Sequence, residues 1–432
     1  MPKALIITYY WPPAGGGGVQ RWLKFVRYMR DYGWEPVIFT PLNPEFSNFD
    51  ESLLDEIPEG LRVIKTSIWE PFNAYKRIIG RKNEEKIQPG FLQESNANSL
   101  LQKISVWIRG NLFIPDAKRF WIRPSERNII RYLKNNKIDV LISTGPPHSN
   151  HLIARNVKRA TGIKWLADFR DPWTNIDYYE KLKLTRMADR SHHSLERSVL
   201  KEADKVITVS WSWAHDFQEK TGVRPEVITN GFDPEDFKSV KSTSENAELI
   251  ILHIGSLNAD RNPHAFWKAL SEINANANRG RKIRVKLIGP TDISVFKEIE
   301  AFGLYKCIEH IPHLPHKEVI THLFNADVLL LPLNNTPNIN GVIPGKLYEY
   351  LAAKKTILAI GSTTGDSAKI LKETGSGCIF EFNDSSGIAK FLSNELLGDQ
   401  NHYPVYNEEA TKKYSRVELT AVLCKMLEDM IT

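Results

Sequence analysis

Residues 4–40 read "ALIITYYWPPAGGGGVQRWLKFVRYMRDYGWEPVIFT", and this stretch decides the fold class. The apolar run at 4–8 predicts a buried strand, the amphipathic pattern at 19–32 predicts a helix, and the apolar run at 35–40 predicts a second strand. A strand, a helix and a strand in this order form a βαβ unit, which favours a parallel sheet.

Four consecutive glycines, residues 15–18, stand between the first strand and the helix. A turn needs only one or two, so the surplus indicates backbone that approaches a phosphate or a sugar closely, and we expect Gly16 and Gly17 to bind the ligand. Gln20 stands where the dinucleotide fingerprint G-x-G-x-x-G requires its third glycine, and the nucleoside triphosphatase loop is also absent. A flexible surface turn is the alternative.

The alternation of strands and helices recurs along the 432 residues, which is enough chain for two domains. The polar, serine-rich residues 237–248 interrupt it and predict a linker. We expect a first, acceptor-side domain at 1–236 with a basic and aromatic insertion at about 70–125, a second domain at 249–412, and a helix at 413–432 that packs back on the first domain. The predicted fold class is α/β, with two Rossmann-like, doubly wound domains that face each other across a cleft.

Cysteine content and hydropathy exclude several classes of protein. The three cysteines are far apart and lack metal-ligand spacing, which argues against a disulfide or zinc framework and fits the reducing cytoplasm. No run approaches the roughly 20 apolar residues of a membrane span, and the first apolar run is too short for a signal peptide. We therefore expect a soluble, cytoplasmic enzyme.

The formal net charge of +6 is concentrated in residues 70–134, which hold thirteen Lys/Arg against six Asp/Glu. Aromatic residues are interleaved with these charges, namely Trp107, Phe113, Phe120 and Trp121. This pattern suits transient docking on an anionic membrane. An insertion that packs its tryptophans inward is the alternative. The segment has no recognisable nucleic-acid-binding module, so we expect no nucleic-acid partner.

The stretch "NINGVIPGKLYEYLAAKKTILAIG" at 338–361 carries the clearest binding pattern. Gly345 begins a predicted helix with Lys346 in its first turn and Glu349 one turn further on. A lysine suits phosphate oxygens and a carboxylate suits the vicinal hydroxyls of a ribose, so these three residues are candidates for binding a nucleotide. An ordinary surface ion pair is the alternative.

A second glycine follows a strand in "ILHIGSLNADRNP" at 251–263. Gly255 and Ser256 stand at the end of the strand, and Arg261 precedes the helix that Pro263 begins. We expect these residues to lie beside the same ligand and Arg261 to bind its phosphate. A solvated loop arginine is the alternative.

Two motifs of the first domain, "LISTGPPHSNHLIA" at 141–154 and "WLADFRDPW" at 165–173, also lie at the ends of predicted strands. Asp168, Arg170 and Asp171 bring dense charge beside an apolar strand, which suits general acid/base or substrate-positioning work. A buried structural network is the alternative. His148 is a further catalytic candidate, or else a packing histidine. His148 and His151 without a third ligand make a weak metal pattern, so no metal site is expected.

These motifs resemble the retaining, family 4-like glycosyltransferases with the GT-B fold. The glycine loop, "DFRDPW", "ITNGFDPEDF", "LHIGSL" and "PGKLYEYLAAKKTILAIG" follow the order and spacing of that family along nearly the full length. The motifs "TGPPHSNHLIA" and "ADFRDPW" are similar to a bacterial subset that builds surface polysaccharides.

The resemblance implies transfer of a hexose from a UDP- or GDP-type sugar nucleotide to a hydroxyl of a lipid-linked or oligosaccharide acceptor, in the cytoplasm at the inner face of the membrane. It implies no cofactor and no metal, because Arg261, Lys346 and helix N-termini would stabilise the departing diphosphate. Glu349 would bind the donor ribose as the second glutamate of a Glu-x7-Glu motif.

Three positions depart from the pattern of the family. Gly341 stands in place of the first glutamate, Ser256 in place of an arginine, and Arg170 in place of a histidine. No acid/base residue and no acceptor-binding residue can be carried over. A sugar-nucleotide epimerase and a non-catalytic protein that binds a nucleotide sugar are the alternatives.

Overall fold

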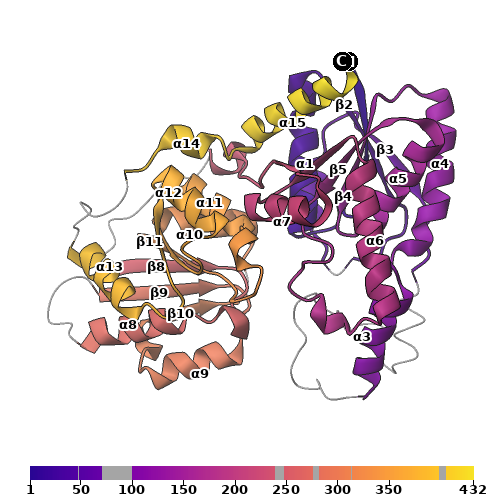
Figure 1. The fold of residues 1–432 in the computed structure, drawn as a ribbon. Coiled ribbons are helices and arrows are strands. Elements are labelled where there is room, and N and C mark those ends of the chain that lie inside the picture. The colour runs from indigo at the N-terminus through magenta and orange to yellow at the C-terminus, as the bar shows by residue number, and fades with distance from the viewer. Residues whose placement is uncertain (47, 71–99, 239–247, 276–281, 313, 398–404) are drawn as a thin grey trace. The chain divides into compact units, whose positions relative to one another are not determined.

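The computed structural model describes residues 1–46, 48–70, 100–238, 248–275, 282–312, 314–397 and 405–432. They form two compact units (Figure 1): unit 1 comprises Met1–Thr229 and Leu419–Thr432, and unit 2 comprises Asn230–Glu418. Residues 71–99 of the predicted insertion and 239–247 of the predicted linker lie outside the described residues.

Unit 1 is built on a seven-stranded sheet in the order β3-β2-β1-β4-β5-β6-β7, and its strands pair in parallel. This is the doubly wound order, in which the chain reverses its direction of progress between β1 and β4. The strands are β1 Lys3–Ile7, β2 Glu35–Pro41, β3 Arg62–Thr66, β4 Val140–Gly145, β5 Lys164–Phe169, β6 Lys205–Thr208 and β7 Glu226–Val227.

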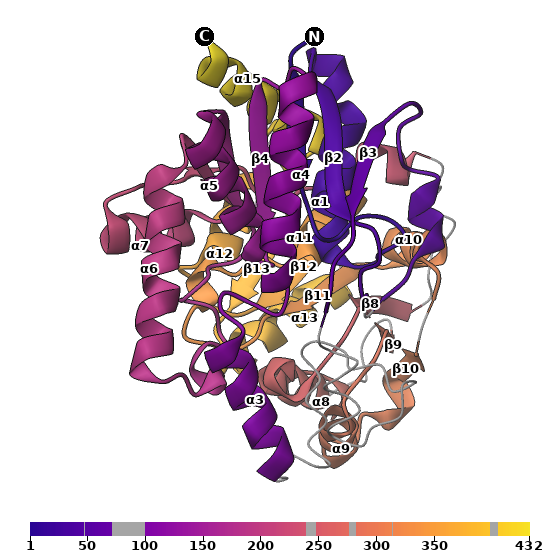
Figure 2. The ribbon, with the colours of Figure 1, turned by 90° about the vertical axis from the view of Figure 1, so that its right-hand side faces the viewer.

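The helices of unit 1 cover both faces of its sheet. They are α1 Gly17–Met29, η1 Arg30–Tyr32, η2 Glu51–Leu54, α3 Leu100–Leu112, η4 Arg119–Trp121, α4 Ile122–Asn135, α5 Ser149–Thr161, η5 Glu180–Leu182, α6 Arg186–Glu202, α7 Trp211–Thr221 and α15 Arg416–Ile431. Helices α4 and α5 lie side by side (Figures 1 and 2), and α5 packs on β4 and β5.

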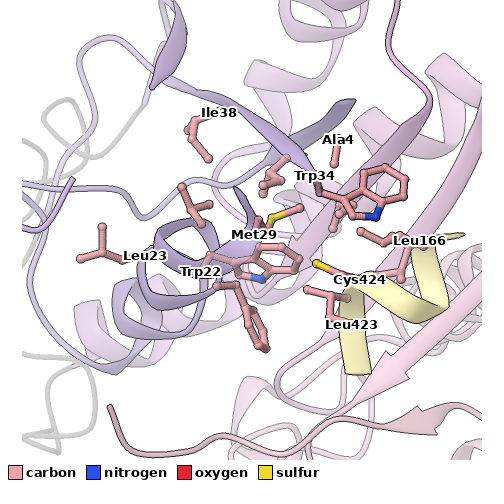
Figure 3. Packing of buried hydrophobic residues seen from close by; sticks show 14 of the residues in the cluster. Ala4, Trp22, Leu23, Met29, Trp34, Ile38, Leu166, Leu423 and Cys424 are labelled. Atoms are coloured by element: carbon pink, nitrogen blue, oxygen red, sulfur yellow. The ribbon is translucent and has the colours of Figure 1, made fainter. Parts of the chain in front are cut away.

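One face of this sheet packs against α1 and the C-terminal helix α15 (Figure 3). Ala4 and Ile6 of β1 alternate toward this face, as expected for a strand whose side chains point to opposite sides in turn, and they join Trp22 of α1 and Leu423 of α15 in one buried cluster. Full burial of such side chains stabilises the fold by about 1.5–3 kcal/mol each. The last helix of the chain is therefore part of the core of unit 1.

Unit 2 repeats the plan with six parallel strands in the order β10-β9-β8-β11-β12-β13. The strands are β8 Glu248–Ile254, β9 Lys282–Ile288, β10 Ile308–Ile311, β11 Val328–Pro332, β12 Thr356–Ile360 and β13 Gly377–Phe380. The helices are η6 Pro234–Phe237, η7 Ala259–Arg261, α8 His264–Ala275, α9 Ile293–Ala301, η8 Tyr305–Cys307, α10 His316–Asn325, η9 Ile339–Gly341, α11 Gly345–Ala353, α12 Asp366–Thr374, α13 Ser385–Leu397 and α14 Glu408–Lys412.

The predicted fold class, with two Rossmann-like α/β domains, is confirmed. Several elements were missed, among them the edge strands β3 and β13. The β3 sequence "RVIKT" holds two basic residues and is mostly not buried, so it lacks the continuous apolar run that marks a central parallel strand. The basic and aromatic insertion also divides: Trp121 is fully buried and stacks on Phe39 of β2, whereas Trp107 and Phe120 are exposed.

A buried ion pair fixes α1 to the sheet. Arg21 Nη2 donates to Asp168 Oδ1 over 3.1 Å and Arg21 Nε donates to Asp168 Oδ2 over 3.2 Å, and both side chains are essentially inaccessible to water. Trp22 Nε1 and Thr144 Oγ1 also donate to Asp168 Oδ2, over 2.7 and 2.8 Å. Arg21 further donates to the carbonyls of Ile228 and Thr229. The carboxylate is therefore fully used in joining α1, β4 and β5.

We expect Asp168→Ala to lower the free energy of unfolding by about 3–5 kcal/mol, because it leaves Arg21 buried without its counter-ion. Urea denaturation followed by circular dichroism measures this change. The matched control is Glu226→Ala in the exposed pair with Lys205, 2.7 Å apart, which should cost about 1 kcal/mol at most. Equal effects of the two substitutions would contradict the structural role of Asp168.

Candidate functional site

The predicted phosphate-binding residues of unit 2 come together at the carboxyl end of β8. Gly255 follows the strand with a φ of +88°, and its N–H donates to the carbonyl of Ile288 over 2.6 Å. A Cβ at Gly255 would lie 2.5 Å from Cε of Lys346, so only glycine admits the lysine side chain here. The missing side chain of Gly255 therefore lets Lys346 pack against its backbone, although the two residues are far apart in the chain.

Lys346 lies in the first turn of α11, and its ammonium group is enclosed. Nζ is buried and has no hydrogen-bond partner among the described residues. Burial, together with the smaller effect of the positive charge of Arg261, lowers its pKa to about 7, while the charge of Glu349 opposes the shift. A buried cation without a partner is costly, which indicates that the site is built to receive a negative group.

Arg261 supplies the second cation and is held in place by neutral groups. Its Nε donates to Oδ1 of Asn334 over 2.9 Å and its Nη1 donates to the carbonyl of Ser256 over 3.2 Å. Burial lowers the pKa of the guanidinium. No ion pair joins Arg261 to a carboxylate in the part of the chain that the structure describes. Ser256 thus positions Arg261 through its backbone, a role that the motif did not predict.

The N-terminus of α11 adds the positive end of a helix dipole to these two cations. Its N-cap, Pro344, makes no side-chain hydrogen bond, and the first turn has no acidic residue. Gly345 is exposed and a Cβ there would meet nothing within 4 Å. Free backbone N–H groups beside Lys346 are a ready anion site.

Glu349 lies one turn after Lys346, close enough for its charge to raise the pKa of that lysine. The neighbouring Tyr350 fixes the helix to the strand, because its hydroxyl accepts from the N–H of Ile254 over 3.1 Å. Between Asp327 and Glu349 the sequence contains no acidic residue. Gly341, which replaces the first glutamate of the family motif, is buried in η9 and its N–H donates to the carbonyl of Asn338.

In unit 1 the structure gives separate roles to the three charged residues of "DFRDPW". Asp168 forms an ion pair with Arg21. Its contacts therefore support the structural alternative and not the predicted catalytic role. The partner in this structural pair is Arg21 and not Arg170. Arg170 donates from Nη1 to the carbonyl of Gly18 over 3.0 Å and from Nη2 to the carbonyl of Pro146. Burial raises the pKa of Asp171, while the charge of Arg170 opposes this shift. Asp171 thus stays the acid/base candidate of this motif.

His148 is a neutral, packed histidine. Its ring stacks on Trp173 with centroids 4.4 Å apart and an interplanar angle of 2°. Burial holds its pKa well below the usual range, and the neighbouring His151 lowers it further. The ring stacking and the lowered pKa therefore fit a packing histidine. One atom is not explained by packing, because Nδ1 is buried without a hydrogen-bond partner among the described residues. The catalytic role stays a prediction.

The glycine loop begins α1 with open space around it. Gly16 has a φ of +91°, and a Cβ at Gly16 or Gly17 would meet nothing within 4 Å. Gly18 is different, because its Cβ would lie 3.0 Å from Nη1 of Arg170. Packing inside the chain thus explains Gly18, and the positive φ explains Gly16. Neither reason applies to Gly17, and the space beside it is open to a ligand.

Sequence reasoning missed the residues that hold the site in place. Asn334, which orients Arg261, lies two residues after the end of β11 at the carboxyl edge of the sheet. This place could have indicated a functional residue. Among the described residues, no group of three or more His, Cys, Asp or Glu could hold a metal ion. No helix within these residues is long and apolar enough to span a membrane.

The fold and the site define an α/β protein with two Rossmann-like units, of which the second holds two cationic side chains beside a helix N-terminus. Two family models match parts of the chain. Residues 234–413 match the model "Glycosyl transferases group 1", and residues 89–236 match "Glycosyltransferase Family 4". The two matched regions together cover most of the chain. A comparison with curated protein sequences found no match.

Solved structures show the same fold over the whole length. A glycosyltransferase from Rickettsia africae has a TM-score of 0.63 at 14% identity, with 100% of this chain and 99% of that chain covered. Sucrose-phosphate synthase from Thermosynechococcus elongatus has a TM-score of 0.62 at 13% identity, with 99% and 98% covered. HepE from Anabaena in complex with UDP has a TM-score of 0.62 at 10% identity, with 99% and 100% covered. The fold and the family matches together support a GT-B glycosyltransferase.

The lowered pKa of Lys346 predicts how stability changes with pH. Between about pH 7 and the ordinary lysine value of 10.5, the unfolded chain holds a proton that the folded chain has lost. Below pH 7 the folded chain bears the full free-energy cost of burying the charged form of Lys346. This cost falls as the pH rises, because the buried amine loses its proton. We expect the free energy of unfolding of the wild type, relative to Lys346→Met, to rise by up to about 1.4 kcal/mol per pH unit in this window.

Denaturation of both proteins at a series of pH values in phosphate-free buffer measures this difference. A difference that stays constant from pH 7 to 10 would show that Lys346 titrates as an exposed lysine does.

Proposed function

We propose that this protein transfers a sugar, with retention, from a nucleotide diphosphate sugar to a hydroxyl group of an acceptor, and that Lys346 and Arg261 bind the donor diphosphate. The observation that carries the proposal is the buried ammonium group of Lys346 and the partly buried guanidinium of Arg261, which make no ion pair with a carboxylate among the described residues and lie beside the N-terminus of α11. A diphosphate supplies the negative charge that this arrangement lacks. HepE, which has a similar fold, was crystallised in complex with UDP and with UDP-glucose, so UDP is the first nucleotide to test.

In the proposed reaction the bond between the anomeric carbon and the diphosphate oxygen breaks, and its electron pair leaves with the diphosphate. Lys346, Arg261 and the N–H groups of α11 stabilise the charge that develops there, the task that a divalent cation performs in other transferases. The acceptor oxygen bonds to the anomeric carbon, and its proton passes to the departing phosphate. This route needs no metal and no cofactor besides the donor.

Glu349 is proposed to bind the ribose, as an acceptor of hydrogen bonds from its two hydroxyls. The sugar cannot be bound by the first glutamate of the family motif, because Gly341 stands there. We propose that backbone groups of residues 341–344 bind the sugar hydroxyls instead. Backbone N–H and C=O groups can form hydrogen bonds with the sugar hydroxyls and, unlike a glutamate, add no negative charge beside the diphosphate.

An exposed aromatic and basic surface of unit 1 supports a lipid-linked acceptor and a place at the inner face of the cytoplasmic membrane. Trp69 and Phe120 are 61% and 41% exposed, and their ring centroids lie 4.7 Å apart. Arg119 lies over the Phe120 ring at 5.8 Å. The hollow beside them is lined by Ile114, Arg119, Phe120, Ile122, Arg123, Glu126 and Asn156. Aromatic rings beside arginines suit the interface of an anionic membrane. The corresponding function is surface polysaccharide synthesis.

The donor site is tested by thermal shift with UDP, GDP and their sugars. We expect one nucleotide family to stabilise the wild type, by about 2.7 kcal/mol at a concentration one hundred times its Kd. Lys346→Met and Glu349→Gln should lose most of this stabilisation, whereas the exposed Lys372→Met on α12 should keep it. The assignment of the site is wrong if no nucleotide sugar stabilises the wild type or if all variants respond alike.

Transfer itself is tested by product analysis with the stabilising donor. A new glycoside formed on an added acceptor supports the transferase, and an altered sugar nucleotide without an acceptor supports an epimerase. Binding without either product supports a non-catalytic protein.

Membrane contact is tested by sedimentation with vesicles of phosphatidylglycerol and phosphatidylcholine. We expect binding at low salt that requires the anionic lipid, and its loss in the double variant Trp69→Ser, Phe120→Ser, because both the aromatic and the basic contacts contribute. The matched control is Tyr305→Ser, an aromatic residue 76% exposed in unit 2, which should bind as the wild type does. Equal binding to neutral and anionic vesicles would refute the electrostatic part of the proposal.

A further inference from the structure

We propose that unit 1 holds a second anion site, formed by Arg170 and the first turn of α1, that binds a phosphate or carboxylate group of the acceptor. All of its residues belong to unit 1, and its assignment to the acceptor rests on the proposed function. The proposal stands on three observations: an arginine without a counter-ion, an open helix N-terminus beside it, and a neighbouring carboxyl group that does not neutralise it.

Arg170 is an arginine that only backbone carbonyls hold. Nη1 and Nη2 donate to the carbonyls of Gly18 and Pro146, while Nε is buried and has no hydrogen-bond partner among the described residues. By contrast, Arg21 and Arg159 pair with carboxylates, those of Asp168 and Glu202. No such ion pair reaches Arg170 in the described part of the chain. Burial lowers its pKa accordingly.

The first turn of α1 lies directly against this guanidinium, because Gly18 is both its hydrogen-bond acceptor and its neighbour in space. The helix is 13 residues long, its N-cap Gly16 makes no side-chain hydrogen bond, and its first turn has no acidic residue. The space beside Gly16 and Gly17 is open. Uncapped N–H groups and a cation at the same place make an oxyanion site.

The nearby acidic groups do not neutralise Arg170. Asp168 is the closest in sequence, but its oxygens are taken by Arg21, Trp22 and Thr144. Asp171 makes no ion pair with Arg170 in the described structure, and burial favours its protonated form. Tyr10 presents its ring to the guanidinium with the centroid 6.0 Å from Cζ. One positive charge thus remains for a ligand to balance.

The chemistry identifies the ligand as an oxyanion. Guanidinium forks pair with phosphate and carboxylate groups, and uncapped helix N–H groups bind the same ions. In an acceptor this group is either the phosphate of a lipid carrier or the carboxylate of a uronic acid in a saccharide. Neutral saccharides would leave Arg170 unpaired.

Calorimetric titration of the full chain with inorganic phosphate tests the site. The measurement is made in the Lys346→Met background, which removes the unit 2 site and makes the result independent of donor binding. We expect Arg170→Gln to weaken the remaining phosphate binding by about tenfold or more, the effect of losing a charged hydrogen-bonding group. Arg170→Lys should retain part of the affinity, and Arg155→Gln, which replaces a partly buried arginine of α5 bonded to Ser198, should retain all of it.

Gly17→Val separates ligand binding from folding. Its side chain would meet nothing in the chain within 4 Å, so we expect an unchanged circular dichroism spectrum together with weakened phosphate binding. The proposal is overturned if Lys346→Met protein binds no phosphate, or if Arg170→Gln and Gly17→Val both bind it with undiminished affinity. Failure of every nucleotide sugar to bind the wild type would instead refute the proposed function and leave this result standing.

The source of the oxyanion is decided by two further probes in the same background. Dodecyl phosphate represents a lipid phosphate and glucuronate represents an acidic saccharide. The probe that binds more tightly and loses more affinity in Arg170→Gln identifies the acceptor group. If neither depends on Arg170, the site does not serve the acceptor.

Discussion

The buried pair of Arg21 and Asp168 is the interaction on which unit 1 depends. It joins the second turn of α1 to the ends of β4 and β5, and Arg21 also binds the last carbonyls before unit 2 begins. Because burying two charges is costly, such a pair survives only when every oxygen and N–H group is used. Here it sets the position at which α1 starts, so the glycine loop and its N–H groups are held at the carboxyl edge of the sheet.

The protein handles its buried charged groups in two opposite ways. Arg21 is fully compensated within the chain and serves stability. Arg170, Arg261 and Lys346 are not paired with carboxylates in the described structure, and burial lowers the pKa of each. Lowered cation pKa values mean that the empty protein gives up stability at these places. Such costs are concentrated at functional sites because a ligand of opposite charge recovers them.

The sequence allowed much of the fold and part of the site to be predicted. Strands with continuous apolar runs, such as β2, were predicted to within one residue of their observed bounds, whereas β3 at the sheet edge was missed because its two basic residues leave it without a continuous apolar run. Lys346 was found from its place in the first turn of a predicted helix, and Arg261 from its place between a strand and the next helix. The role of Asp168 was not, because its partner Arg21 lies 147 residues away and nothing in "ADFRDPW" reveals which arginine it meets. Local patterns predict which side chains reach a sheet edge, and only the packing decides how they pair.

The charge balance of the unit 2 site links donor binding to protonation. Glu349 is the one acidic residue between Asp327 and the end of α11, so two cations face one carboxylate. With a pKa of about 7, Lys346 has largely lost its proton in the empty protein above neutral pH. In the proposed function, a bound diphosphate would restore that proton, because a nearby negative charge raises the pKa of an ammonium group. A glutamate at position 341 would add a second carboxylate to the site, and the diphosphate would then gain less. With Gly341 at that position, the proposed diphosphate would be the main counter-ion of the two cations.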